Sequence, residues 1–284
     1  MAGKPRVLNP SDPVLWCREA AARIEAGDPK GAIYCYQESL KIRPDVPDVW
    51  YNLGLLLETI GQQTAALGCY TKSSEMFPGD YRFFAERARL LAESGKYLDA
   101  VVAAGDALAV NPHAPQIHAN RAGYLIRAGD AAGAVAAADA ALAIDPANAA
   151  AFANKANALV VLGRTDDAKT VLRSGKEAVP TDERIAKMLA NLLVRTGQWD
   201  EALAVTEEVL HITPEDDEVW SIKGAALCVS GKKRRGGCRI RDGDEDQPER
   251  KILQTQPRRD QKIIKYFFSQ PFQKKVVQVF GRYA

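Results

Sequence analysis

Histidine, cysteine and paired carboxylates are the residue types from which most catalytic and metal sites are built. The chain has three histidines, His113, His118 and His211, and their spacing does not predict that they come together. No P-loop, dinucleotide-binding, zinc-protease or serine-hydrolase motif occurs. The carboxylates are scattered over predicted exposed helix faces. We therefore expect no catalysis, no cofactor and no metal site.

The cysteines do not form a recognisable site either. They are Cys17, Cys35, Cys69, Cys228 and Cys238, an odd number without a C-x-x-C pair. This pattern argues against a disulfide framework or a zinc site and favours reduced thiols. The first residues, MAGKPRVLNPSDP, contain no apolar stretch typical of a signal peptide, and no run approaches a membrane span. We expect a cytoplasmic protein that does not enter membranes.

The elements that would position any binding residues are revealed by one constant interval along the chain. Glycine recurs at this interval at Gly27, Gly61, Gly95, Gly129, Gly163, Gly197 and Gly231. Proline recurs at the same interval from Pro44 to Pro214, and alanine from Ala32 to Ala202. A fourth series is always small: Ala20, Gly54, Ala88, Ala122, Ala156, Ala190 and Gly224. Four series in one register indicate internal repeats.

Each repeat is predicted to form two helices, as the unit 47–80 illustrates. Trp50, Leu53, Gly54 and Leu57 share one helical face. Gly61 is expected to end that helix, because glycine adopts the left-handed conformation of a helix C-cap. A second face follows with Ala66, Tyr70 and Ser73, and Pro78 cannot continue a helix. The small residue at position 8 is predicted to face the small residue at position 20, so that the two helices approach closely.

This pattern resembles the tetratricopeptide repeat (TPR) family, which has a W-x2-L-G-x2-Y, A-x3-F and P signature in a unit of about 34 residues. The resemblance implies an all-α, right-handed α-solenoid of about six and a half repeats. Its first helices would line a concave groove and its second helices the convex back. We predict an N-terminal extension over residues 1–12, a solenoid over 13–230 and a basic tail over 231–284. The repeats start at residues 13, 47, 81, 115, 149, 183 and 217. Position 4 is aromatic at Trp16, Trp50, Phe84, Phe152 and Trp220, and His118 and Ala186 break this series.

The resemblance also implies which side chains would contact a partner. Positions 2, 5, 9, 12 and 13 of each first helix would point into the groove. The candidates that we single out are Arg89, Glu93, Arg127, Asn157, Lys187, Asn191 and Arg195. Arg82, Gln116 and Arg184 occupy further groove positions. Such a polar and modestly basic groove would suit an extended peptide, either acidic or ending in a free carboxylate.

One specialised partner class is not supported. Some members of the family hold the carboxyl end of heat-shock chaperones in a carboxylate clamp. Lys187 and Asn191 match the first part of that pattern, but Ile222 stands where the next repeat needs asparagine. We therefore do not expect chaperone-adaptor function.

The composition changes at Gly231. From there to the end the chain has 15 Lys/Arg against 6 Asp/Glu, while the preceding part has 23 against 30. The segment after Gly231 lacks the apolar face that would complete a seventh repeat. Reading the codons one nucleotide further on from Arg234 permits GKKEEAAVAFEMAMKINP, which would complete it. We hypothesise that residues 234–284 are an out-of-frame tail, which the encoding DNA would test.

The tail has other interpretations. The cluster KKRR at 232–235 is of the kind that serves nuclear import or nucleic-acid binding. The segments KIIKYFF and KKVVQVF have the composition of strands or of a membrane-surface anchor, or of disordered chain that packs on the open end of the solenoid.

The sequence thus predicts a non-enzymatic scaffold that binds a peptide or protein segment, and we do not expect nucleic acid or a membrane as its partner. Two alternatives remain: a regulatory or nucleic-acid-associated protein acting through its tail, and a repeat array that is part of a larger enzyme or sensor. An uncapped last repeat could also pair with that of a second copy.

Overall fold

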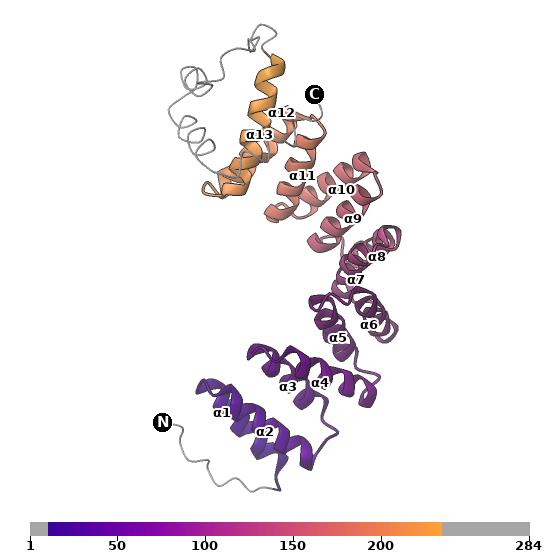
Figure 1. Cartoon of the computed structure of the whole chain (residues 1–284), viewed down its shortest axis with the longest axis vertical. Helices are drawn as coiled ribbons and strands as arrows, with labels where there is room; N and C mark the ends of the chain where they lie inside the picture. Colours follow the sequence, from indigo (N-terminus) through magenta and orange to yellow (C-terminus); the bar gives the residue numbers. More distant parts are fainter. Residues whose placement is uncertain (1–10, 235–284) are drawn as a thin grey trace. The chain divides into compact units, whose positions relative to one another are not determined.

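The computed structural model describes residues 11–234, and within that range it contains thirteen helices and no strand (Figure 1). Side chains are described as far as residue 227. Contacts divide the chain into two units, Met1–Arg164 and Thr165–Ala284. The predicted all-α class and the consecutive helix pairs are confirmed.

The helices follow the predicted repeats. Unit 1 contains α1 (Pro13–Glu25), α2 (Pro29–Ile42), α3 (Pro47–Thr59), α4 (Gln63–Met76), α5 (Tyr81–Glu93), α6 (Tyr97–Val110), α7 (Pro115–Ala128), α8 (Ala131–Ile144) and α9 (Ala149–Val161). Unit 2 contains α10 (Thr165–Ala178), α11 (Glu183–Arg195), α12 (Trp199–Ile212) and α13 (Asp217–Arg234). Positions 1–10 of the predicted extension and positions 235–284 of the predicted tail lie outside the described residues.

The glycine series forms the turn within each repeat. Gly27, Gly61, Gly95, Gly129, Gly163 and Gly197 all have φ between 73° and 90°. The amide after each glycine reaches back to close the helix, as Gln62 N does to Leu57 O at 2.9 Å. This is the Schellman arrangement, which most residues other than glycine disfavour. Gly231, the last of the series, instead lies inside α13.

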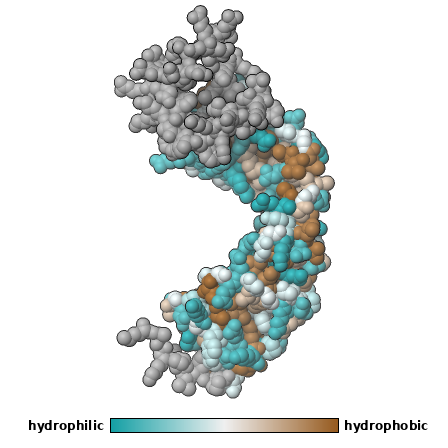
Figure 2. Space-filling view, viewed as in Figure 1, coloured by the Kyte–Doolittle hydropathy of each residue, from teal (hydrophilic) through white to brown (hydrophobic). Residues whose placement is uncertain are grey.

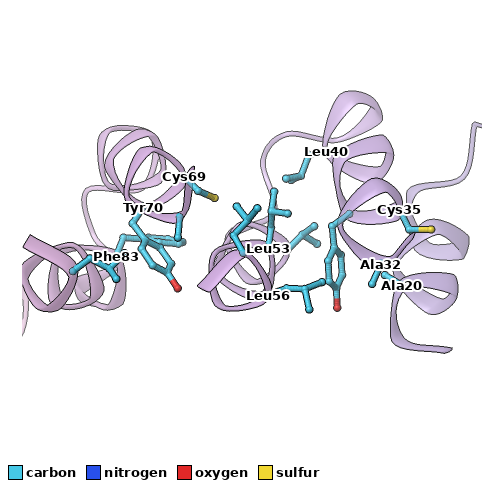
Figure 3. Close-up of a cluster of buried hydrophobic side chains, with 14 residues drawn as sticks. Ala20, Ala32, Cys35, Leu40, Leu53, Leu56, Cys69, Tyr70 and Phe83 are labelled. Atoms are coloured by element: carbon cyan, nitrogen blue, oxygen red, sulfur yellow. The ribbon is translucent and has the colours of Figure 1, made fainter. Parts of the chain in front are cut away.

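The predicted close approach of paired helices occurs at the small residues. Ala20 and Ala32 are fully buried and lie beside each other where α1 meets α2 (Figure 3). Gly54 of α3 packs against the ring of Tyr70 of α4, and an added Cβ would lie 2.3 Å from Tyr70 Cε1. Tyr70 itself is fully buried. The small side chain is therefore needed because an aromatic ring occupies the space.

The core of repeat four is made largely of alanine. Ala122, Ala134, Ala138 and Ala141 of α7 and α8 are fully buried. The corresponding helices of repeat six in unit 2 bury larger side chains, with Ile185 and Leu193 fully buried among them. Fewer apolar atoms are removed from water per helix pair in repeat four, so its packing contributes less stabilisation.

Candidate functional site

Polar bonds join the first helices of repeats two and three, at or next to the positions that the resemblance assigned to a groove. We call the residues at positions 2, 5, 9, 12 and 13 of the first helices the first-helix face. Tyr51 of α3 donates its hydroxyl to Glu86 of α5 at 3.0 Å. Arg82 Nη2 of α5 lies 2.9 Å from Asp48 Oδ1 of α3. These bonds fix the relative register of α3 and α5.

Arg89 lies at the centre of a carboxylate cage on this face. Its guanidinium pairs with Glu58 of α3, with Glu86 at 2.8 Å and with Glu93 at 2.6 Å. Tyr70 donates its hydroxyl to Glu58 at 2.9 Å, which holds that carboxylate in place. Burial alone would lower the pKa of Arg89, but its hydrogen bonds to Glu58 and Glu86 outweigh burial and raise it. Arg89 is therefore a permanently charged structural link.

The predicted groove was modestly basic, but the first-helix face is acidic at α3 and α5. Arg89 and Glu93 were predicted to contact a partner, and the structure places them on the first-helix face but pairs them with each other. Asp48, Glu58 and Glu86 line the same section. Carboxylates thus outnumber cations here.

Two tyrosines of the first helices α3 and α7 are held in their neutral form. Burial, followed by the charge of Glu86, raises the pKa of Tyr51 to about 12. Burial also raises the pKa of Tyr124 of α7 to about 12. Both hydroxyls therefore remain protonated at neutral pH and serve as donors or polar surface rather than as acids.

Two predicted residues of unit 1 remain accessible at α7 and α9. Asn157 is exposed and forms no hydrogen bond with another described residue. Arg127 is exposed, and its guanidinium lies 5.6 Å from the ring centroid of Tyr97. The helices that carry them are linked by Asn154 Nδ2 of α9, which donates to Ala119 O of α7 at 2.8 Å. The side chains of this section are therefore presented on helices whose relative placement is fixed.

In unit 2 the predicted residues of α11 divide into two groups. Lys187 pairs with Asp216, the residue immediately before α13, and lies 3.9 Å from Glu183 and 3.8 Å from Glu218. The hydrogen bond to Asp216 raises the pKa of Lys187 and lowers that of Asp216. Asn191 and Arg195 are exposed and have no ion pair or hydrogen bond with the described residues.

Sequence reasoning missed the residues that surround Arg89 on the first-helix face. Tyr51 and Glu58 occupy positions 5 and 12 of repeat two, so reading the first-helix positions of that repeat would have identified them. Glu86 lies at position 6, next to the assigned positions, and only the structure shows that it belongs to the cage.

Within residues 11–227 no group of three His, Cys, Asp or Glu side chains is placed to hold a metal ion. In the same part of the chain, no helix has the length and hydropathy needed to cross a membrane.

Comparison with known proteins identifies the repeats. Tetratricopeptide repeat models match residues 47–80, 85–149, 125–192 and 177–226, and a TPR repeat model matches residues 21–61. A search of curated proteins found no matching relative.

Solved structures with the same fold include a tetratricopeptide repeat protein from Parabacteroides merdae, 19% identical, with a TM-score of 0.63 over 78% of this chain and 88% of that one. The C-terminal part of a TPR repeat-containing protein from Cytophaga hutchinsonii is 12% identical, with a TM-score of 0.63 over 75% and 88%. YrrB, described as a TPR protein with an unusual peptide-binding site, is 16% identical, with a TM-score of 0.54 over 62% and 91%. The family matches extend over most of residues 21–226, so the chain belongs to the tetratricopeptide repeat family.

Proposed function

We propose that the protein is a non-enzymatic scaffold that binds an extended segment of a partner protein on its first-helix face. The observation that carries this proposal is an asparagine and an arginine that recur in each unit and that are not paired with a carboxylate. Asn157 and Asn191 both occupy position 9, and Arg127 and Arg195 both occupy position 13. All four are exposed, and none has a carboxylate partner among the described residues.

These two side-chain types suit an extended peptide. The asparagine amide donates and accepts, so it can pair with both the N–H and the C=O of a backbone that has no secondary-structure partners. The arginine fork binds carboxylates in a bidentate manner. The partner segment therefore carries acidic side chains or a free terminal carboxylate where it contacts these arginines.

The α3–α5 section of unit 1 has the opposite preference. Glu58, Glu86 and Glu93 surround Arg89 and leave excess negative charge on the first-helix face. A segment that reaches this section would be favoured by basic residues and disfavoured by acidic ones. The proposed binding of peptide has a parallel in YrrB, a TPR protein described as having an unusual peptide-binding site.

We place this activity in the cytoplasm. Cys17, Cys35 and Cys69 are free thiols, and Cys35 and Cys69 are buried. Unpaired cysteines are the usual state of proteins in a reducing compartment.

Fluorescence anisotropy with short labelled peptides tests the proposal on the full chain. The set contains unstructured acidic, basic and neutral sequences, and we expect the acidic ones to bind best. Arg127→Ala/Asn157→Ala in unit 1 and Asn191→Ala/Arg195→Ala in unit 2 should each weaken binding of the peptide to that unit about tenfold, since each pair removes hydrogen bonds to the peptide. Gln37→Ala and Lys30→Ala are matched controls, because both residues are exposed on the second helix α2. Absence of binding to every peptide, or equal losses in the control variants, would contradict the proposal.

A further inference from the structure

An ion pair recurs between successive repeats on the far side of the first helices. Lys155 Nζ of α9 lies 2.6 Å from Asp139 Oδ1 of α8. Lys223 Nζ of α13 lies 3.3 Å from Glu207 Oε1 of α12. In both cases a cation at position 7 of a first helix pairs with an acid on the preceding second helix, and the two pairs have the same separation along the chain. The repeat geometry therefore brings these two positions together.

Arg121 of α7 is the equivalent cation of repeat four, and its acid is missing. Gly105 of α6 stands at the position where the other two repeats have the acid. Arg121 Nε is buried without a hydrogen-bond partner, and its guanidinium forms no ion pair within the described residues. A Cβ at Gly105 would have no atom within 4 Å. The position of the acid is therefore open on α6, and by equivalence with the other two repeats it faces Arg121, which lacks a carboxylate.

The outward face of α6 carries an apolar stripe along its midline. Figure 2 shows apolar and polar residues interspersed on one face of the described part of the chain. On α6, two large apolar side chains are exposed. Leu98 is 71% exposed and Val102 62% exposed. Together with Gly105 and Ala109 they form one stripe along the helix, at i, i+4, i+7 and i+11. Apolar side chains this accessible, arranged on one stripe, are characteristic of a surface that another molecule covers.

The opposite edge of this stripe carries negative charge. Asp99 and Asp106 follow Leu98 and Gly105 by one residue, which places them about 100° further round the helix. Both are exposed and have no ion pair with a described residue. Leu98, Asp99, Val102, Asp106 and Arg121 are together called the α6 patch.

We propose that the α6 patch binds the α6 patch of a second copy of this chain. The occupant follows from charge complementarity, because the patch holds an unpaired cation along one edge and two unpaired carboxylates along the other. When two α6 helices run parallel about a two-fold axis, the cationic edge of each copy faces the acidic edge of the other. Arg121 then pairs with Asp99 or Asp106 of the second copy, and Leu98 and Val102 lie at the centre. The small residues that continue the stripe let the helices approach closely.

The contact should be weak. It is one helix wide and smaller than the roughly 1,200 Å² at which standard interfaces begin, so we expect a dissociation constant of the order of 10–100 μM. Sedimentation equilibrium of the full chain from about 1 to 300 μM covers this range. The wild-type protein should convert from monomer to dimer across it.

Two sets of variants test the apolar centre. Leu98→Glu/Val102→Glu should raise the dissociation constant at least about tenfold, since it removes both apolar contacts and adds like charges. Ile212→Glu is the matched control, because Ile212 is 65% exposed on α12 in unit 2. It should leave the dissociation constant unchanged. Circular dichroism and thermal melting establish that each variant folds.

The charged edges are tested by mixing. Arg121→Glu makes both edges of the patch acidic, and Asp106→Arg reverses part of the acidic edge. Each variant should self-associate less than the wild type. An equimolar mixture should form heterodimers, because the all-acidic patch then faces the more basic one.

The proposal is overturned if the wild-type chain remains a monomer up to about 300 μM. It is equally overturned if a dimer forms but Leu98→Glu/Val102→Glu does not weaken it, because association would then occur elsewhere, such as at the last repeat. Failure of the Arg121→Glu and Asp106→Arg mixture to associate would exclude the parallel pairing.

Discussion

His118 Nε2 lies 3.0 Å from the carbonyl oxygen of Pro112, the proline that ends the preceding repeat. Trp50 Nε1 makes the equivalent contact with Pro44 O at 2.8 Å, and Trp220 Nε1 makes it with Pro214 O at 2.8 Å. A carbonyl only accepts, so Nε2 of His118 must carry the proton. His118 therefore departs from the aromatic series in residue type but preserves its hydrogen bond.

The first prediction concerns this bond. His118→Phe keeps a ring but loses the donor, so we expect the free energy of unfolding to fall by about 0.5–1.5 kcal/mol. His118→Trp should restore the bond that repeats two and seven use and keep wild-type stability or exceed it. Urea denaturation followed by circular dichroism measures both. Equal stability of the Phe and Trp variants would show that the hydrogen bond contributes nothing.

The second prediction concerns the close contact of Gly54 with Tyr70. Gly54→Ala should destabilise the protein by about 1–3 kcal/mol despite the better helix propensity of alanine, because the ring of Tyr70 is buried and cannot move aside. Gly68→Ala is the matched control on α4, where an added Cβ meets no atom within 4 Å. That change should stabilise by about 0.5–1 kcal/mol. Thermal melting measures both variants. A shift of both melting temperatures in the same direction would contradict this account.

The third prediction concerns a variant that gives Arg121 an acidic partner at Gly105, in the second helix of repeat three. Gly105→Glu should be more stable than Gly105→Gln by about 0.2–1 kcal/mol, because only glutamate forms an ion pair with the guanidinium. The difference should shrink at high salt and disappear when Arg121→Gln is also present. A difference that persists without Arg121 would have another cause.

The fourth prediction concerns pH. Pairing with Lys187 lowers the pKa of Asp216 in the folded protein, so the stabilisation is fully present above the unfolded-state value of about 3.9. It is lost as the pH falls through the lower folded-state pKa. Asp216→Asn should therefore reduce the unfolding free energy more at pH 7 than at pH 2, as chemical denaturation at both values measures. Asparagine keeps the side-chain oxygen that accepts from Val219 N, at 3.1 Å in the wild type, so the variant removes the charge and keeps the cap. A loss that does not depend on pH would show that the charge of Asp216 does not contribute.

The fifth prediction concerns repeat four, whose alanine-rich core buries little apolar volume per helix pair. Amides of α7 and α8 should exchange with deuterium faster than those of α11 and α12. Native-state hydrogen exchange with peptide-level resolution measures this order. Slower exchange in α7 and α8 would show that packing area does not control local opening here.

The repeat architecture could be predicted because its signals are local and repeated. Six glycines of the series adopt positive φ, as a helix C-cap between two apolar faces requires. Ala20 and Ala32 are buried at the predicted contact of α1 with α2, and this contact could be predicted because small residues recur at the same two positions of each repeat. Gly231 shows the limit of this reasoning, because the series predicted a turn there and the structure continues α13 through it.

The character of the candidate site was decided by tertiary structure. The sequence identified Arg89 and Lys187 as first-helix residues. The structure pairs Arg89 with Glu58 and Lys187 with Asp216, and each of these carboxylates lies in or beside a neighbouring repeat. Periodicity determines which face of a helix a residue occupies, because that depends only on spacing along the chain. Which neighbour a flexible charged side chain contacts depends on how adjacent helices pack. The packing pairs Arg89 and Lys187 with carboxylates, whereas Arg127 and Arg195 have no carboxylate partner among the described residues.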